Sequence, residues 1–144
     1  MKVKTVCGGL NPLSTRAIKH AVMMYESIRK RTTDCMYIAN NTGFTFEQVS
    51  LIKSYIFYNR HVLDNGRCSL FDANYEMAES WRRLSAKSDK YIKEHDIILL
   101  HHELLEIKLI LDGHSQHDAH EIASKTFDYG EASNKYYRSL GFKM

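Results

Sequence analysis

The chain has 144 residues, of which 44% are hydrophobic, so it is long enough for one domain with a buried core and too short for two domains of usual size. Its formal net charge is +3, from 20 Lys and Arg against 17 Asp and Glu. This excess is too small to indicate nucleic-acid binding from charge alone. The three cysteines, Cys7, Cys35 and Cys68, are widely spaced, which excludes a disulfide framework and a cysteine-rich zinc site.

No apolar run approaches the roughly 20 residues that cross a bilayer, so we expect a soluble cytoplasmic protein with no membrane contact. We predict a single domain over residues 1–144, with residues 1–10 as a disordered N-terminal extension. Pro12 and Ser14 predict the start of a first helix that continues to about Thr32. Its expected inner face consists of Ile18, Ala21, Val22, Tyr25 and Ile28.

Residues 35–58 are predicted to form a pair of helices like a helix-turn-helix (HTH) unit. The first is expected over Cys35 to Asn41 and stops at Gly43. The second begins at a capping box made by Thr45 and Gln48. An HTH unit and a pair of helices that only pack together require the same short turn with its glycine, so both interpretations are open.

A nucleic-acid-binding unit would read bases with the exposed face of the second helix. That face carries Glu47, which repels phosphate, and one basic residue, Lys53, so we favour packing as the purpose of the pair. Under the nucleic-acid interpretation, the phosphate contacts are expected from Arg29, Lys30, Arg31 and Lys53.

The next segment, residues 61–71, contains the turn signal Asp64-Asn65-Gly66 between short apolar pieces. A small hairpin and an irregular loop both fit it, and we favour the loop. Asp72 predicts the cap of a helix over 73–84. Further helices are expected over 97–111, 115–125 and 130–140. The predicted fold class is all-α, a single compact domain of about six helices.

The helix over 97–111 carries a dense group of ionisable side chains. At about 100° per residue, His102, Glu103 and Glu106 fall within an arc of about 100°. Apolar residues border this arc and also cover the opposite face of the helix, so the helix is expected to be buried on two sides. Buried carboxylates are costly unless they are paired, protonated or bound to metal.

A metal site is one interpretation of this group. His102 and Glu106 are four residues apart, as are the two histidines of the His-Glu-x-x-His motif that holds zinc. The expected ligands are His102, Glu106 and either His117 or His120, with Glu103 as the base that activates water. The expected cofactor is a divalent metal, zinc or similar.

Two interpretations without metal are also open. In the first, His120 or His61 acts with Glu103 as general acid and base, while Arg83 or Lys53 binds a phosphate. In the second, the group has no chemistry, and Glu103 and Glu106 form ion pairs with a neighbouring cation. The candidate cations are Arg82, Arg83 and Lys108.

Several short motifs occur in a recognisable order. They are Ile38-Ala39 to Thr42-Gly43-Phe44, Ile52-Lys53 to Phe57, His61, Ala78 to Leu84, Asp96-Ile97 to His102-Glu103, Glu106, and Ala119-His120. With this order, residues 11–137 resemble an α-helical domain found at the C-terminal end of phage minor head (minor capsid) proteins and of some bacterial polymorphic toxins. The polar positions that match are Lys53, His61, Arg83, His102, Glu103, Glu106 and His120. Tyr55 is a departure, because the pattern tends to carry another histidine there.

The resemblance implies an effector domain carried by a mobile genetic element, located in the bacterial host cell or in the virion. The first functional hypothesis is a hydrolase that acts on nucleic acid, with Glu103 and a histidine transferring protons. The alternative is a non-catalytic phage structural or DNA-binding accessory domain, and a purely protein-binding module is a third option. The expected partners are nucleic acid, a phage head or a cognate immunity protein.

Overall fold

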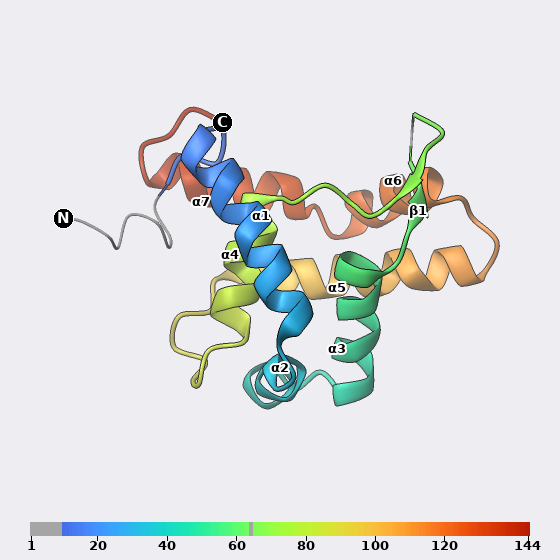
Figure 1. The fold of residues 1–144 in the computed structure, drawn as a ribbon, viewed down its shortest axis with the longest axis horizontal. Helices are drawn as coiled ribbons and strands as arrows, with labels where there is room; N and C mark the ends of the chain where they lie inside the picture. The colour runs from blue at the N-terminus through green and yellow to red at the C-terminus, as the bar shows by residue number, and fades with distance from the viewer. Residues whose placement is uncertain (1–9, 64) are drawn as a thin grey trace.

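The computed structural model describes residues 10–63 and 65–144. Most of these residues form helices that surround one long central helix (Figure 1). In this part of the chain there are seven α-helices: α1 (Thr15–Lys30), α2 (Asp34–Thr42), α3 (Phe46–Lys53), α4 (Tyr75–Leu84), α5 (Glu94–Leu111), α6 (Gln116–Thr126) and α7 (Tyr129–Ser139). A π-helix, η2 (Ser54–Tyr58), continues α3. The predicted all-α class and single domain are confirmed. The predicted disordered extension lies outside the described residues except for Leu10, and so does Cys7.

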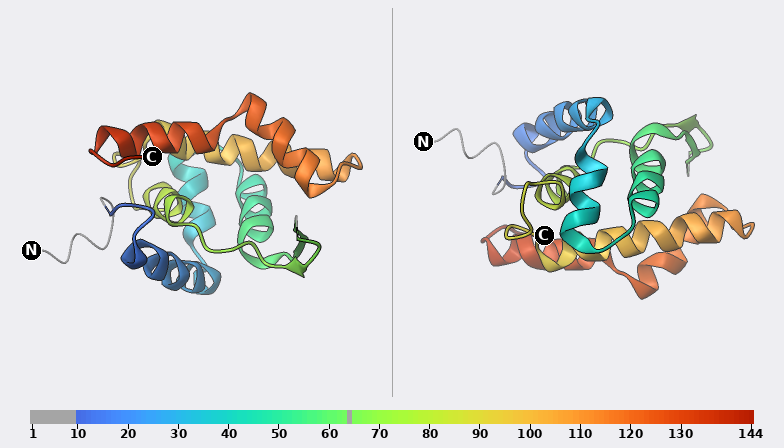
Figure 2. Two further views of the ribbon diagram at one scale, coloured as in Figure 1. Left: turned by 90° about the horizontal axis from the view of Figure 1, so that it is seen from above. Right: turned by 90° about the horizontal axis from the view of Figure 1, so that it is seen from below.

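The central helix α5 separates the two sides of the molecule. It packs against α3, α4, α6 and α7, which explains why it is apolar around most of its circumference. Figure 2 shows α6 and α7 on one side of α5 and α1, α2 and α3 on the other, with α4 between α1 and α5. The largest fully buried side chain, Trp81 of α4, contacts the ring of Phe57 in the core between these sides. No helix among the described residues is long and apolar enough to cross a membrane.

Local signals set most helix ends where the sequence predicts them. The hydroxyl of Ser14 accepts a hydrogen bond from the backbone N–H of Ala17 and begins α1. Thr45 and Gln48 form the predicted capping box of α3. Gly43 ends α2 with a φ of 84°, a conformation that glycine adopts without steric cost.

The prediction for the inner face of the first helix is partly wrong. Ile18 and Val22 are 54% and 46% exposed, whereas Ala17 and Met24 are buried. The helix is turned so that small residues at its N-terminal end pack on Tyr75 of α4 and on α7. The hydrophobic pattern alone did not indicate this rotation, because apolar residues occur on more than one side of α1.

Two boundaries in the middle of the chain also differ from the prediction. In the segment predicted as an irregular loop, β1 (His61–Val62) and β2 (Cys68–Ser69) pair as a short antiparallel hairpin, so the preference for a loop is wrong for these residues. The fourth helix begins at Tyr75, where Asn74 caps it, and not after Asp72. Asp and Asn both cap helices well, so two candidate caps two residues apart could not be distinguished from the sequence.

A buried ion pair joins α4 to α5. The guanidinium of Arg83 donates two hydrogen bonds of 2.8 Å to the carboxylate of Asp96. Arg83 also donates a hydrogen bond to Nε2 of His95 at 3.0 Å. Nε2 accepts this bond only if it carries no proton, so the imidazole of His95 is neutral and lies beside the positive charge of Arg83. Burial is the main cause that lowers the pKa of His95 to about 4; Asp96 opposes it, and Arg83 reinforces it.

This low pKa predicts a loss of stability in mild acid. An imidazole whose folded pKa lies below its unfolded value of about 6.5 stabilises the folded state above that pH, and the contribution is lost as the pH falls toward about 4. Between pH 7 and pH 4, the free energy of unfolding of the wild type is expected to fall by about 3 kcal/mol more than that of His95→Gln. Urea unfolding at both pH values measures the difference. The exposed His114→Gln variant should follow the wild type, and equal losses in wild type and His95→Gln would contradict the prediction.

Candidate functional site

Three of the predicted ligand residues converge where α5 meets α6. His102 and Glu106 lie one turn apart on α5, and His120 comes from α6. Oε1 of Glu106 lies 3.1 Å from Nε2 of His102 and 3.0 Å from Nδ1 of His120. The three donor atoms all lie within 4.8 Å of one another. We call these three residues the triad. The structure thus selects His120, and not His117, as the partner of the pair on α5.

The second carboxylate oxygen of Glu106 is held by neighbouring side chains. The hydroxyl of Tyr55 donates a short hydrogen bond to Oε2, and the amide of Gln116 donates to it at 3.4 Å. Burial acts to raise the pKa of Glu106, but its polar contacts with His102, His120 and Tyr55 outweigh burial and lower the pKa to about 2. Glu106 is therefore a carboxylate with Oε2 fixed by donors and Oε1 directed at both imidazoles.

The imidazole of His102 lies between two oxygen acceptors. Its Nδ1 is 2.9 Å from the carbonyl oxygen of Phe127, so Nδ1 carries a hydrogen and donates it. Its Nε2 faces the carboxylate of Glu106, which also only accepts. Nε2 therefore either carries a second proton or presents its lone pair to a cation that Glu106 shares.

The π-helix after α3 positions the tyrosine that holds Glu106. In η2 the backbone N–H of Asn59 donates to the carbonyl oxygen of Ser54, five residues earlier. The wider turn directs three consecutive residues, Tyr55, Ile56 and Phe57, into the interior. Such turns are frequent at functional sites because they change which side chains face a site.

His61, a predicted acid or base, supports this arrangement from the hairpin. Its Nε2 lies 2.8 Å from the carbonyl oxygen of Tyr55, and its ring stacks on Phe71 with centroids 3.9 Å apart. These contacts hold Tyr55 and Phe71 in place and leave the ring of His61 outside the triad.

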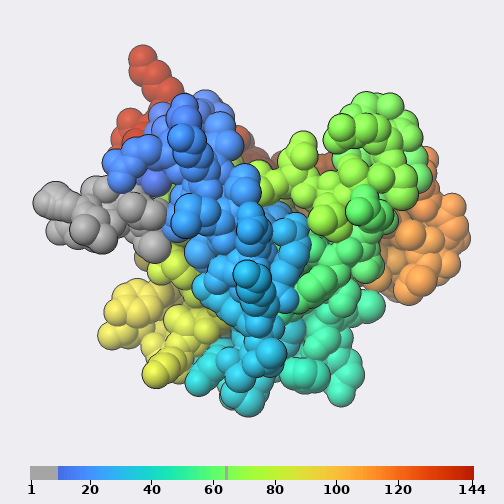
Figure 3. Space-filling view, in the orientation of Figure 1, coloured from blue at the N-terminus to red at the C-terminus, as the bar shows by residue number. Residues whose placement is uncertain are grey.

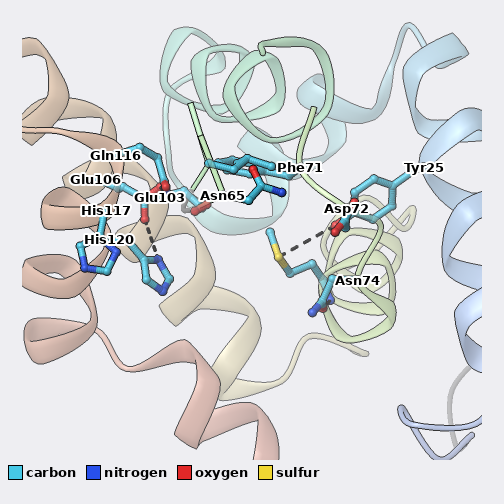
Figure 4. A pocket seen from close by; sticks show the side chains of 12 residues that line it. Tyr25, Asn65, Phe71, Asp72, Asn74, Glu103, Glu106, Gln116, His117 and His120 are labelled. Carbon is cyan, nitrogen blue, oxygen red and sulfur yellow. Dashed lines mark hydrogen bonds and ion pairs between the residues drawn. The ribbon is translucent and has the colours of Figure 1, made fainter. Parts of the chain in front are cut away.

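A cavity of about 510 Å³ lies beside the triad (Figure 4). Glu106, Gln116 and His120 line one side of it, while Tyr25, Phe71 and Asn74 line the other. In Figure 4 the carboxylate of Glu106 and the ring of His120 point toward each other at the edge of the cavity. The side chain of His120 is 57% exposed, so a small molecule can reach the triad from solvent.

Glu103, the predicted base, lines the same cavity. Its side chain is buried, and Oε2 has no hydrogen-bond partner among the described residues. Burial, and next the charge of Glu106, raise its pKa well above the usual value. A second cavity, of about 390 Å³, is also lined by Glu103, His102 and His120. Glu103 is therefore a carboxyl group without a structural partner in this part of the molecule, placed between two cavities and next to the triad.

Two predicted phosphate-binding residues lie in ion pairs outside the cavity. Nζ of Lys53 donates to the carboxylate of Asp34 and to the carbonyl oxygen of Arg31, both at 2.9 Å. Arg83 is bound to Asp96, as described above. Both cations are buried, so the structure does not bring them to the triad.

The interpretation in which Glu103 and Glu106 pair with basic residues is not supported by the geometry. Arg82 binds Glu79 at 2.9 Å, Arg83 binds Asp96, and Lys108 is exposed on α5. The partners of Glu106 are instead imidazoles, a hydroxyl and an amide. The buried ion pairs that the sequence indicates do exist, but between other residues.

The HTH-like pair, α2 and α3, presents little basic surface. Lys53 is buried, and the exposed side chains of α3 include Glu47 and Leu51. At the end of α1, Lys30 is exposed, whereas Arg31 donates to Ser27 at 3.3 Å. The helix pair therefore fits the packing interpretation better than a base-reading one.

Sequence reasoning missed the residues that orient the triad. Tyr55 appeared only as a departure from the resembled pattern, and Gln116 follows a helix cap without any other signal. The carbonyl oxygen of Phe127 could not be identified from a side-chain pattern, because it is a backbone atom brought near His102 by the turn between α6 and α7.

Comparison of the chain with protein-family models, with curated protein sequences and with solved structures finds no match. The resemblance to the phage minor head and toxin domain therefore stays a prediction, and the function has to be argued from the site.

Proposed function

We propose that the protein is a hydrolase that depends on a divalent metal ion, with His102, Glu106 and His120 as ligands and Glu103 as the group that accepts a proton from water. The observation that carries the proposal is the imidazole of His102 held between two acceptor oxygens. A neutral imidazole there directs its Nε2 lone pair at a carboxylate oxygen 3.1 Å away. Two lone pairs at this distance repel each other unless a cation lies between them.

The set of donors supports zinc or a similar metal. Two histidines and one glutamate, with a fourth position open, form the ligand set of several catalytic zinc sites, whereas structural zinc sites are closed by four protein ligands. Glu106 and His120 also line the cavity described above, from which water or a substrate could reach a metal held by the triad. Tetrahedral bonds of about 2.0–2.2 Å separate neighbouring ligand atoms by about 3.3–3.6 Å. The two distances to Oε1 of Glu106, 3.0 and 3.1 Å, are a few tenths of an ångström shorter, so a small outward movement of the two imidazoles would admit the metal.

The neighbours of the triad support the same conclusion. Metal-bound imidazoles usually donate their second N–H to a carbonyl or carboxylate, as His102 does to Phe127. Metal-bound carboxylates are usually hydrogen-bonded on their other oxygen, as Glu106 is by Tyr55. A metal in this position polarises a bound water or a substrate oxygen. The part left to the chain is proton transfer, for which Glu103 has an unpartnered oxygen beside the triad. Because its pKa is raised, the carboxylate of Glu103 is a stronger base than an ordinary glutamate once it has lost its proton.

Hydrolysis of small activated esters tests the proposal. The zinc-loaded wild type is expected to hydrolyse bis(4-nitrophenyl) phosphate or 4-nitrophenyl acetate above the rate of free zinc. Glu103→Gln keeps the shape of the side chain and all three ligands, so it should bind zinc normally and lose about 10²–10⁴-fold in rate. Glu121→Gln, on the exposed side of α6, is the matched control and should retain full activity. The proposal would be refuted if the zinc-loaded wild type had no activity, or if Glu103→Gln were as active as the wild type.

A further inference from the structure

We propose that the substrate of this site is a single-stranded nucleic acid, whose phosphates bind an arginine-lined groove that adjoins the cavity beside the triad. This inference rests on the proposed function, because it assigns a substrate class to the same site. The groove lies between α1 and residues 69–73, together with Arg60 and Arg67, and we call it the arginine groove after Arg29, Arg60 and Arg67. Figure 3 shows α1 in blue and the hairpin in green on either side of this hollowed face.

The arginine groove and the cavity beside the triad share one wall. Tyr25, Phe71 and Asp72 line both spaces, and the groove has a volume of about 390 Å³. A ligand that fills both must therefore be extended and pass over this wall. A nucleic-acid strand is such a ligand, because its phosphates repeat along a flexible chain.

Charge in the groove favours a polyanion. Three guanidinium groups line it, against the carboxylates of Glu26 and Asp72. Arg29 is fixed, since its Nε donates to the carbonyl oxygen of Phe57 at 2.7 Å. Arg60 and Arg67 are exposed and form no ion pair with another described residue. A guanidinium without a carboxylate partner is well suited to bind phosphate through two N–H donors.

The shared wall favours an unpaired strand over a duplex. Phe71 is half-buried, and one face of its ring is covered by His61. Phe71 lines the cavity, and an unpaired base can stack on the part of its ring that His61 leaves uncovered, whereas Tyr25, at 1% exposure, forms only buried wall. Bases in a duplex are already stacked on each other and are not available for this contact.

The reaction that follows is the hydrolysis of a phosphodiester. The oxygen of a water molecule forms a bond to phosphorus while the bond from phosphorus to one ester oxygen breaks. Glu103 accepts one proton from the water, and the leaving oxygen takes up one proton from Glu103 or from solvent, so the products are a phosphomonoester and an alcohol. The arginine groove holds a neighbouring phosphate of the same strand and positions the reacting one.

Binding of a fluorescein-labelled single-stranded DNA oligonucleotide at several salt concentrations tests the inference. In a first variant, Arg60→Gln and Arg67→Gln are combined. In the control, Lys87→Gln and Lys125→Gln remove the same charge from exposed positions that line neither space. The arginine variant should bind the oligonucleotide about tenfold more weakly, and its slope of log affinity against log salt should decrease by about 1 to 1.5. The control should match the wild type in slope and bind within about twofold of it.

The outcomes separate this inference from the proposed function. In one outcome the protein binds zinc and hydrolyses a small ester, and yet the oligonucleotide does not bind or the arginine variant matches the control. The substrate assignment would then be wrong, while the proposed hydrolase function would be unaffected. If zinc does not bind, the hydrolase is wrong, and this substrate assignment falls with it. Competition by poly-glutamate as strong as by unlabelled oligonucleotide would also overturn the inference, because the groove would then bind polyanions of another class.

Discussion

Replacing Glu106 by Gln is expected to abolish the binding of Zn²⁺ and the stabilisation that the metal gives to the folded chain. Oε1 of Glu106 is the atom on which both imidazoles converge, at 3.1 and 3.0 Å. An amide has nearly the same shape as a carboxylate but lacks its negative charge, so the variant keeps the geometry and loses the ligand. Isothermal titration calorimetry should give one zinc per wild-type chain and none per variant chain.

Thermal unfolding gives a second readout of the same prediction. At a free zinc concentration of about 100 times Kd, binding adds about 2.7 kcal/mol, which for a chain of this size raises Tm by about 5–10 °C. Each variant is compared with and without zinc, so a change in its own stability does not affect the result. Glu121→Gln is the control, because Glu121 belongs to a second, exposed group with His117 and Asp118. If Glu121→Gln loses zinc binding and Glu106→Gln keeps it, the metal binds the exposed group and not the triad, which would contradict the prediction.

A second large effect is expected from Asp34→Ala, which removes the centre of a buried network. The carboxylate of Asp34 accepts hydrogen bonds from Nζ of Lys53 at 2.9 Å and from Nε1 of Trp81 at 3.0 Å. Without it, an ammonium group and an indole N–H stay buried with fewer partners, which costs about 3–5 kcal/mol. This is a large part of the 5–15 kcal/mol that stabilises a typical domain.

Urea unfolding measures this cost. The double variant Asp34→Ala with Lys53→Met should recover part of the loss, because it also removes the unpaired charge. As a control, Glu131→Ala removes an exposed ion pair with Arg138 and should cost less than about 1 kcal/mol. A loss in Asp34→Ala no larger than in this control would show that the buried network does not stabilise the fold.

Much of the fold follows from local sequence signals. Ser14, Thr45 and Gly43 act within a single turn of the chain, so their effect does not depend on distant residues. The rotation of α1 about its axis depends on which partner it meets, and neither Ile18 nor Val22 carries that information. The cap at Asn74 in place of Asp72 was not predicted either, because Asp and Asn are about equally good caps.

The candidate site divides in the same way. His102 and Glu106 share a helix face by their spacing, so their meeting could be predicted from α5 alone. Which carboxylate each basic side chain would pair with could not be predicted, because carboxylates on several helices are possible partners. Lys53 and Arg83 were expected at a phosphate and instead lie in buried ion pairs. Tyr55 reaches Glu106 only because η2 departs from the regular α-helical turn, and no pattern in the sequence indicates that departure.

A crystal structure of the zinc-soaked protein, with anomalous diffraction recorded at the zinc absorption edge, would show directly where the metal binds. We expect one strong anomalous peak about 2.0–2.2 Å from Nε2 of His102, Nδ1 of His120 and Oε1 of Glu106. A peak only at the exposed group of His117, Asp118 and Glu121, or no peak in protein exposed to excess zinc, would contradict this expectation.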